Sequence, residues 1–440
     1  MRSGKRPGRR KLSAGTVFML VLLAAVLGGS ALVLGRLSSG ATVDLSKLNM
    51  SVLDIREDPS REAADSNDEE TPSVKTQTSP KKNESVPTET AAAKNEEKGF
   101  TLTVGGSIAL SGEVRKNSRS TDAKVADYAD VMMLLAPQIH SDVNAVFVEN
   151  IFSDKHKASD IVAPTQAVML LQEAGFDTAA CGFSQAYASG KDGTEATLMA
   201  LDSKGITALG IRYADVSGNP DIRTVNGVRT AFLQYTATVP SKTRKAMEKD
   251  GTGGMIPEAE LSVITQEIGL ARERGAEAVI VLISWGKNGS SAPDKTQREL
   301  AAGIAEAGAD LIIGCGSHMP QTAEYLSGRD GRSVLCVWSL GTLLSGDRGN
   351  VKRIAGYLLH VTVQRDGQGG VLIRDPAYTP VYTWKYKQDS RFYYRCIASD
   401  GEAPDGMDKE QRKMMEKAAE TITALLKDAP LSEREQTDGP

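Results

Sequence analysis

The sequence predicts an α/β fold with mixed sheets beyond about Gly99. Apolar runs of strand length alternate there with amphipathic stretches long enough to form helices, which is the pattern of strands joined by helical crossovers. Some runs, such as "AVIVLIS", are apolar at almost every position, as expected of strands that are covered on both faces. The pair Asn226-Gly227 separates two strand-like runs and indicates a tight hairpin. We therefore expect parallel strands with antiparallel additions.

The expected elements follow one another in a regular order. Strands are expected at 100–106, 144–150, 177–183, 206–211, 221–236 (a hairpin), 276–286, 309–317, 333–341 and 355–375 (a late pair). Helices are expected at 128–140, 163–176, 193–205, 258–275, 294–308 and 408–428. Three helix exits, "AGFD", "RGAEAV" and "AGADLI", share a glycine just before the next strand. Such a glycine ends a helix and turns the chain toward the sheet.

The N-terminus carries the signal of a membrane anchor. Six Lys or Arg residues precede twenty uncharged residues that run from Thr16 to Gly35. Twenty helical residues span about 30 Å, the thickness of the hydrocarbon layer, and a positive flank stays in the cytoplasm. We expect a basic cytoplasmic tail at 1–15, a single-pass signal anchor at 16–35 in the cell membrane, and an extracytoplasmic remainder. Cleavage as a signal peptide near "GGSALVLG" is the alternative.

Three further regions follow the anchor. Residues 36–98 form a polar linker rich in Ser, Thr, Pro, Glu and Lys, a composition that cannot bury a core. Residues 99–375 form the α/β domain. Residues 376–440 hold an aromatic strand pair and a C-terminal helix. The aromatic residues either pack on the domain edge or form an exposed platform that binds a polymer or glycan.

Composition excludes several classes of function. A net charge of -4 argues against a nucleic-acid-binding surface, which needs clustered Lys and Arg. The four cysteines show no CxxC motif, so neither a disulfide scaffold nor a zinc ribbon is expected. Cys181, Cys315 and Cys336 adjoin apolar runs and are expected to be buried. A Cys315–Cys336 bridge is the alternative in an exported protein.

Ligands of open α/β sheets bind outside the carboxyl ends of the strands, and there the sequence places glycines and short polar residues. Trp285 is either a stacking wall for a ligand or a buried support under the sheet. The residues expected to line a binding cleft are Gly106, Glu149, Asn150, Ser184, Gln185, Ser284, Trp285, His318, Gln321 and Thr342.

Two kinds of catalytic centre can be weighed against these residues. The stretch "GFSQA" places Ser184 after a strand, as in a nucleophile elbow, but it lacks the second glycine. A triad would also need His318 or His360 as its base. A metal centre needs several converging carboxylates and imidazoles, whereas the strand ends supply only Glu149 and His318. These two are the best candidates for catalysis, and we expect no bound metal or cofactor.

The chain resembles the CapA family of capsule, or poly-γ-glutamate, biosynthesis proteins. The resemblance covers about 100–362 and is carried by "LTVGGSIAL", "VFVENI", "AVIVLISWG", "AGADLIIGCGSHMPQ" and "VWSLGTLL". It implies a metallophosphatase-like α/β/β/α sandwich. It also implies a protein that assists the synthesis, export or binding of an anionic polymer at the cell surface, with the polymer, wall fragments and membrane synthase subunits as partners.

The chain departs from the family where the family keeps its polar site. The family's Gly-Asp pair is Gly105-Gly106 here, and its Asn-Asn-His is Phe183-Ser184-Gln185. Its His-Trp-Gly begins with Ser284, and its Gly-His-His-Pro-His turn keeps only His318 among the imidazoles. The Asp and most of the His of these motifs are lost, so we expect a degenerate site without metal-dependent catalysis. The alternative is a residual hydrolase or transferase acting on phosphate, peptide or polyglutamate bonds.

Overall fold

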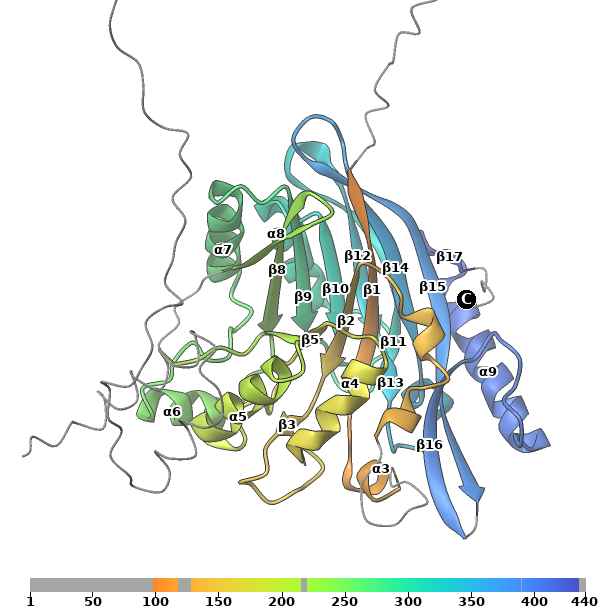
Figure 1. Cartoon of the computed structure of the whole chain (residues 1–440). Helices are drawn as coiled ribbons and strands as arrows, with labels where there is room; N and C mark the ends of the chain where they lie inside the picture. Colours follow the sequence, from red (N-terminus) through yellow and green to blue (C-terminus); the bar gives the residue numbers. More distant parts are fainter. Residues whose placement is uncertain (1–97, 118–127, 215–219, 389, 435–440) are drawn as a thin grey trace, which may run out of the picture. The chain divides into compact units, whose positions relative to one another are not determined.

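The computed structural model describes residues 98–117, 128–214, 220–388 and 390–434, all of which belong to one compact unit. Two mixed sheets form its centre (Figure 1). The segments expected to form the tail, the membrane anchor and nearly all of the linker lie outside the described residues. Within the described part, no helix has the length and apolar character needed to cross a membrane.

The larger sheet has nine strands and is parallel on one side and antiparallel on the other. Its main order is β16 (Arg391–Ala398), β15 (Val371–Gln388), β14 (Ala355–Arg365), β1 (Gly99–Ile108), β2 (Val143–Val148), β5 (Thr178–Ala180) and β6 (Thr207–Leu209). Two short strands complete it: β13 (Thr342–Leu344) pairs with β1, and β17 (Ser432–Glu433) pairs with β15. The four strands from β1 to β6 are parallel, whereas β14, β15 and β16 are antiparallel neighbours.

The smaller sheet has six strands. Its order is β11 (Pro320–Ser327), β12 (Ser333–Leu340), β10 (Leu311–Cys315), β9 (Ala278–Ser284), β8 (Val228–Thr236) and β7 (Asp221–Val225). The four central strands are parallel, and the two outer strands run antiparallel to their neighbours. A separate two-stranded pair joins β3 (Ile151–Phe152) and β4 (Val162–Ala163).

Helices cover the outer faces of both sheets (Figure 1). The described helices are α3 (Gly112–Lys116), α4 (Met169–Glu173), α5 (Gly190–Asp202), α6 (Ser241–Lys249), α7 (Leu261–Glu273), α8 (Lys295–Ala307) and α9 (Lys409–Leu426). Short 3-10 turns are η2 (Ala129–Val131), η3 (Ala136–Gln138), η4 (Thr165–Val168), η5 (Arg329–Gly331) and η6 (Val351–Arg353).

Three apolar clusters define the layers. The first lies between the sheets and joins side chains such as Phe147 of β2 to Leu282 of β9. The second packs α4 and α5 on the outer face of the larger sheet, and the third packs α7 and α8 on the outer face of the smaller one. Burying one such large apolar side chain contributes about 1.5–3 kcal/mol. The result is an α/β/β/α arrangement, with α9 packed against β15 and β14.

Local sequence signals account for several element ends. Asn226 and Gly227 both have positive φ, at 46° and 83°, as the expected hairpin turn requires. Helix α8 begins with a capping box formed by Asp294 and Gln297 and ends at Gly308, which has φ 106°. Such a cap contributes about 1 kcal/mol.

Some expectations are wrong in detail. The helix expected at 128–140 is a series of short turns, and Pro137, which has no N–H to donate, lies at the start of η3. The expected boundary at 375 falls inside β15, an 18-residue strand that begins at Val371 and ends at Gln388. Helix α6 and strand β11 were not expected. All four cysteines are buried and free, so the Cys315–Cys336 bridge is absent.

Candidate functional site

The two sheets are joined at one end by a chain crossing at Gly341. Strand β12 of the smaller sheet ends at Leu340, and after Gly341 the chain enters β13 of the larger sheet. Gly341 has φ 74°, and its carbonyl accepts the Ser107 N–H at 3.0 Å. A Cβ at Gly106 would lie 2.4 Å from the same carbonyl oxygen. Gly106 is therefore required for the close approach of β1 and β13.

Glu149 and His318 meet at this end of the strands. Glu149 follows β2, and its backbone N–H donates to the Ile108 carbonyl at 2.9 Å. His318 follows β10, and its Nε2 lies 3.4 Å from Glu149 Oε2. The side chains are 17% and 33% exposed, so the pair is partly covered yet accessible from solvent. Of the expected site residues, these two form the clearest chemical pair.

The backbone at His318 is unusual for a residue with a side chain. Its φ is 55°, in a left-handed region that costs a non-glycine residue about 1–3 kcal/mol. The preceding Ser317 is fully buried, and its hydroxyl donates to the Met319 carbonyl at 2.7 Å. That turn presents the imidazole to Glu149.

Burial dominates the electrostatics of Glu149. It raises the pKa of the carboxyl group, and the neighbouring His318 and Ser107 act in the opposite direction. Burial also raises the pKa of the Cys315 thiol, and the Glu149 charge adds to that rise. Cys315 is therefore a neutral thiol, whose Sγ donates to the Gly341 carbonyl at 3.5 Å.

Two buried hydroxyls lie on the paired strands beside Glu149. Ser107 of β1 is in register with Thr342 of β13. Neither Ser107 Oγ nor Thr342 Oγ1 makes a well-formed hydrogen bond within the described residues, although the Ser107 hydroxyl lies close enough to the Glu149 carboxyl group to lower its pKa. Thr342 was expected at the site; Ser107 was not, although it directly follows the glycine pair at the end of the first apolar run.

Three other expected site residues are engaged in the scaffold. Asn150 is buried, accepts the Leu110 N–H at 2.8 Å and donates to the Ile161 carbonyl at 3.2 Å. Trp285 is 2% exposed, stacks on Trp338 with 5.6 Å between ring centroids, and donates to the Trp338 carbonyl. It is therefore a buried support.

Gln321 is fully buried in the same way. Its Nε2 donates to the carbonyls of Ser290 and Ala292, and its Oε1 accepts from Gln297. These hydrogen bonds hold the loop before α8 in place. Gln321 therefore positions neighbouring segments of the chain, and its side chain is not accessible to solvent.

The stretch after β5 lies against the smaller sheet. The Ser284 hydroxyl donates to the Gly182 carbonyl at 2.5 Å, and Gln234 donates to the same carbonyl at 2.7 Å. Ser184 is half-buried and Gln185 is exposed. Within the described residues no hydrogen bond joins Ser184 to a histidine, and this observation provides no support for a nucleophile elbow.

His360 belongs to the core of the larger sheet. It lies between the hydroxyls of Thr103 and Thr379, at 3.0 Å from each, and also contacts Arg434. Burial lowers the pKa of its imidazole to about 3, and the Arg434 charge contributes to that shift. It is a neutral structural histidine.

Most of the aromatic side chains on the C-terminal strands are buried. Trp384, Tyr393 and Tyr394 are all buried, whereas Phe392 is 44% exposed. Tyr386 stacks between Trp384 and Tyr393, at 4.2 and 5.4 Å. Trp384 belongs to the apolar cluster between the sheets, and Tyr394 belongs to the cluster on the outer face of the larger sheet. These side chains are therefore packed into the domain and do not form a broad exposed platform.

The donors at the strand ends do not fit a metallophosphatase metal site. Glu149 supplies one carboxylate and His318 one imidazole, and the neighbouring groups are hydroxyls and a neutral thiol. Across the described part of the chain, no three His, Cys, Asp or Glu side chains are arranged to hold a metal ion. A di-metal centre needs more ligands than this pair can offer.

Solved structures with some likeness to this chain include two hydrolases. The calcineurin-like phosphoesterase YfkN of Bacillus subtilis is 11% identical with a TM-score of 0.39, covering 74% of this chain and 98% of that one. The sulfate thiohydrolase SoxB of Thermus thermophilus is 12% identical with a TM-score of 0.35, covering 74% and 61%.

Curated relatives and a family model give closer matches. The PGA biosynthesis protein CapA of Bacillus subtilis is 25% identical over 228 residues, 51% of this chain and 57% of the relative. The capsule biosynthesis protein CapA of Bacillus anthracis is 26% identical over 236 residues, 52% and 57%. The match thus spans little more than half of either relative. The model for the bacterial capsule synthesis protein PGA_cap matches residues 101–347, more than half of the chain, and the protein belongs to this family.

Proposed function

We propose that this protein is a membrane-anchored, extracytoplasmic protein that assists the synthesis, export or binding of an anionic cell-surface polymer of the poly-γ-glutamate type. Its family membership, together with relatives named as PGA and capsule biosynthesis proteins, supports a polymer of this type. The basic tail and the apolar segment at 16–35 support the anchor. Membrane synthase subunits and wall fragments are the further partners that such a place in the envelope implies.

The observation that carries the proposal is the composition of the strand-end site. The Glu149–His318 pair is partly exposed and lies beside buried hydroxyls. Among the described residues, this site does not contain the ligand set of a metal centre. A carboxyl group whose pKa is raised by burial holds its proton to higher pH than a free one. Protonated carboxyl and imidazole groups can both donate hydrogen bonds to a carboxylate. We therefore propose that the site binds polymer and lacks metal-dependent catalysis.

The short distance between the Glu149 and His318 side chains favours a second candidate function, that of a hydrolase or transferase. Glu149 and His318 are 3.4 Å apart, close enough to act together as base and acid. In this hydrolase or transferase, Glu149 would accept a proton from the attacking water or amine, and His318 would protonate the leaving group. The substrate would carry a phosphate, peptide or polyglutamate bond.

One set of measurements on the purified full-length protein separates these functions. We expect saturable binding of poly-γ-glutamate, weakened several-fold by His318→Gln and unchanged by His156→Gln, a control on the loop after β3. Metal-free turnover that disappears in Glu149→Gln but not in Glu273→Gln, an exposed control on α7, would establish the second function. Stoichiometric Mn, Fe or Zn together with turnover would refute the proposed absence of metal-dependent catalysis.

A further inference from the structure

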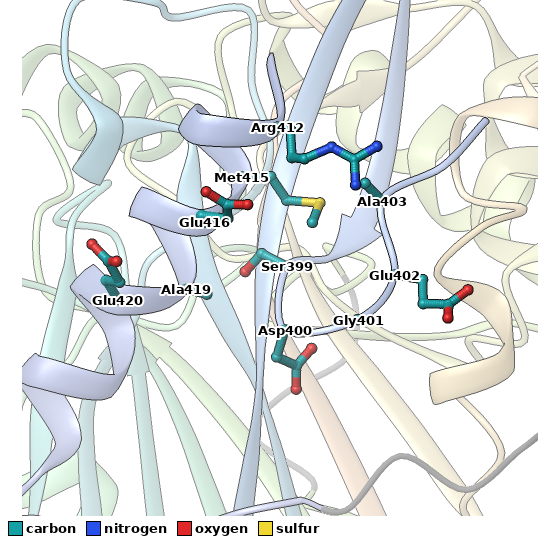
Figure 2. A pocket seen from close by; sticks show the side chains of 10 residues that line it. All are labelled: Ser399, Asp400, Gly401, Glu402, Ala403, Arg412, Met415, Glu416, Ala419 and Glu420. Atoms are coloured by element: carbon teal, nitrogen blue, oxygen red, sulfur yellow. The ribbon is translucent and has the colours of Figure 1, made fainter. Parts of the chain in front are cut away.

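A pocket away from the strand-end site lies between the loop that follows β16 and one face of α9 (Figure 2). Its volume is about 410 Å³, within the range of sites that hold small molecules. The pocket is formed by the part of the chain beyond the family match, which ends at 347. Its chemistry is therefore not covered by the proposed function.

The charge of the pocket is strongly acidic. Asp400 and Glu402 come from the loop, Glu416 and Glu420 from α9, and Arg412 is the single cation of the lining. Within the described residues, Glu402, Arg412, Glu416 and Glu420 form no ion pair, whereas Glu410 on the same helix pairs with Lys413 at 3.2 Å. Repulsion among like charges on one helix face is unfavourable, and a cationic ligand would relieve it.

A buried hydroxyl provides a second, independent observation. Ser399 is 3% exposed, and its backbone N–H donates to the Pro380 carbonyl at 2.8 Å. Its Oγ is buried and has no hydrogen-bond partner among the described residues. Figure 2 shows this hydroxyl in the middle of the lining side chains. An unpaired buried hydroxyl costs about 1–3 kcal/mol, so a ligand that donates to it gains affinity.

The arrangement selects an organic ligand over a metal ion. Described carboxylates do not come together in a group of three that could hold a metal, so the negative charge is spread across the pocket. The apolar side chains of Ala403, Met415 and Ala419 lie between the charged groups. Such a surface suits a methylene chain that ends in an ammonium group. Arg412 can pair with a carboxylate at the other end.

We propose that this pocket binds a diamino acid, free or within a short peptide. Its ammonium groups would face the Glu416 and Glu420 carboxylates and the Ser399 hydroxyl, its methylene chain would lie on Met415, and its carboxylate would face Arg412. Lysine and the dipeptide Lys-Lys are the simplest probes of this chemistry.

Titration of the full-length protein with these probes tests the proposal. We expect saturable binding of Lys-Lys that weakens as salt is added, because screening reduces attraction between exposed charges. Glutamate and Nε-acetyl-lysine should bind at least about tenfold more weakly, the size of one lost charge-assisted hydrogen bond. Glu416→Gln with Glu420→Gln should weaken Lys-Lys binding by a similar factor, whereas Glu410→Gln should leave it unchanged.

Several outcomes would overturn the inference. These are the absence of saturable binding, an equal loss in Glu410→Gln and in the double variant, and binding of calcium with no binding of either lysine probe. Ser399→Ala adds a further check, because it should weaken binding of the probes without lowering the thermal unfolding temperature. The strand-end variants at Glu149 and His318 should not change this binding, so its failure would leave the proposed function untouched.

Discussion

The carboxyl group of Glu149 links the candidate site to protein stability. Burial raises its pKa in the folded protein, against smaller opposing effects of His318 and Ser107. The folded state therefore holds the proton more firmly than the unfolded chain, in which a Glu titrates near about 4.3. The contribution of this group to the free energy of unfolding is fully present below that value and declines as the pH rises above it.

The Glu149→Gln variant should lack this decline. We expect the free energy of unfolding of the wild type, relative to that of the variant, to fall as the pH rises from about 4 to about 8. Urea denaturation of both proteins across this range measures the difference, with Glu273→Gln as an exposed control. Parallel stability curves for the wild type and Glu149→Gln would contradict the assignment.

Asp310 is a second buried carboxyl group, and its role is structural. Its side chain is 3% exposed and contacts Arg272 at 2.6 Å and Arg332 at 2.9 Å. It also accepts the Val279 N–H at 2.7 Å, which ties the end of α8 to β9. Burial raises its pKa, while Arg272 and the Val279 N–H oppose that shift.

Replacement of this carboxyl group should be costly. We expect Asp310→Ala to lower the free energy of unfolding by about 1–3 kcal/mol, because it leaves the buried Val279 N–H without its acceptor. Asp347→Ala is the matched control: that carboxylate is 39% exposed and lies 3.4 Å from Arg353, so its loss should cost at most about 1 kcal/mol. Similar losses in the two variants would exclude a special role for Asp310.

At the scale of elements, local signals predicted much of the fold. The Asn226-Gly227 hairpin and the capping box of α8 depend on residues close together in the chain, and both are present. The expected helix at 128–140 failed because its apolar spacing is equally compatible with a buried irregular segment. Strand β13 has only three residues, and its partner β1 lies far away in the sequence, so no local pattern reveals it.

The sequence predicted only part of the candidate site. Glu149 and His318 could be singled out because they directly follow apolar runs. Asn150, Trp285 and Gln321 follow or flank such runs too, yet their partners are distant groups. Whether a polar side chain lines a cleft or supports a loop depends on those partners, which a single sequence does not show.

The close approach of β1 to Gly341, where the chain passes from β12 to β13, gives a prediction for these elements. In Gly106→Ala the new Cβ would meet the Gly341 carbonyl oxygen at 2.4 Å, and a backbone atom cannot move aside cheaply. We expect a loss of about 1–3 kcal/mol in the free energy of unfolding. The control is Gly253→Ala, where no atom lies within 4 Å of the added Cβ and the change should stay within about 0.5 kcal/mol. Equal stabilities of the two variants would show that the backbone around Gly341 can move to accept the added Cβ.

For the whole molecule, the C-terminal part is continuous with the α/β domain. The family match ends at residue 347, yet β14, β15 and β16 extend the larger sheet beyond it. Tyr378, Tyr382, Trp384, Ile422 and Leu426 contribute to the cluster between the sheets. The aromatic segment is thus part of the core that holds the two sheets together.

A truncation after Asp375 should therefore abolish folding. It cuts β15 and removes β16 and α9, with at least five large buried side chains that contribute about 1.5–3 kcal/mol each. That sum is comparable with the entire stability of a typical domain, about 5–15 kcal/mol. In detergent solution we expect a product without a cooperative unfolding transition, whereas a stop after Arg434 should unfold like the full chain. A 1–375 product with an unchanged thermal transition would show that the aromatic strands and α9 are dispensable, because the remaining faces of β14 and β1 would then suffice to close the core.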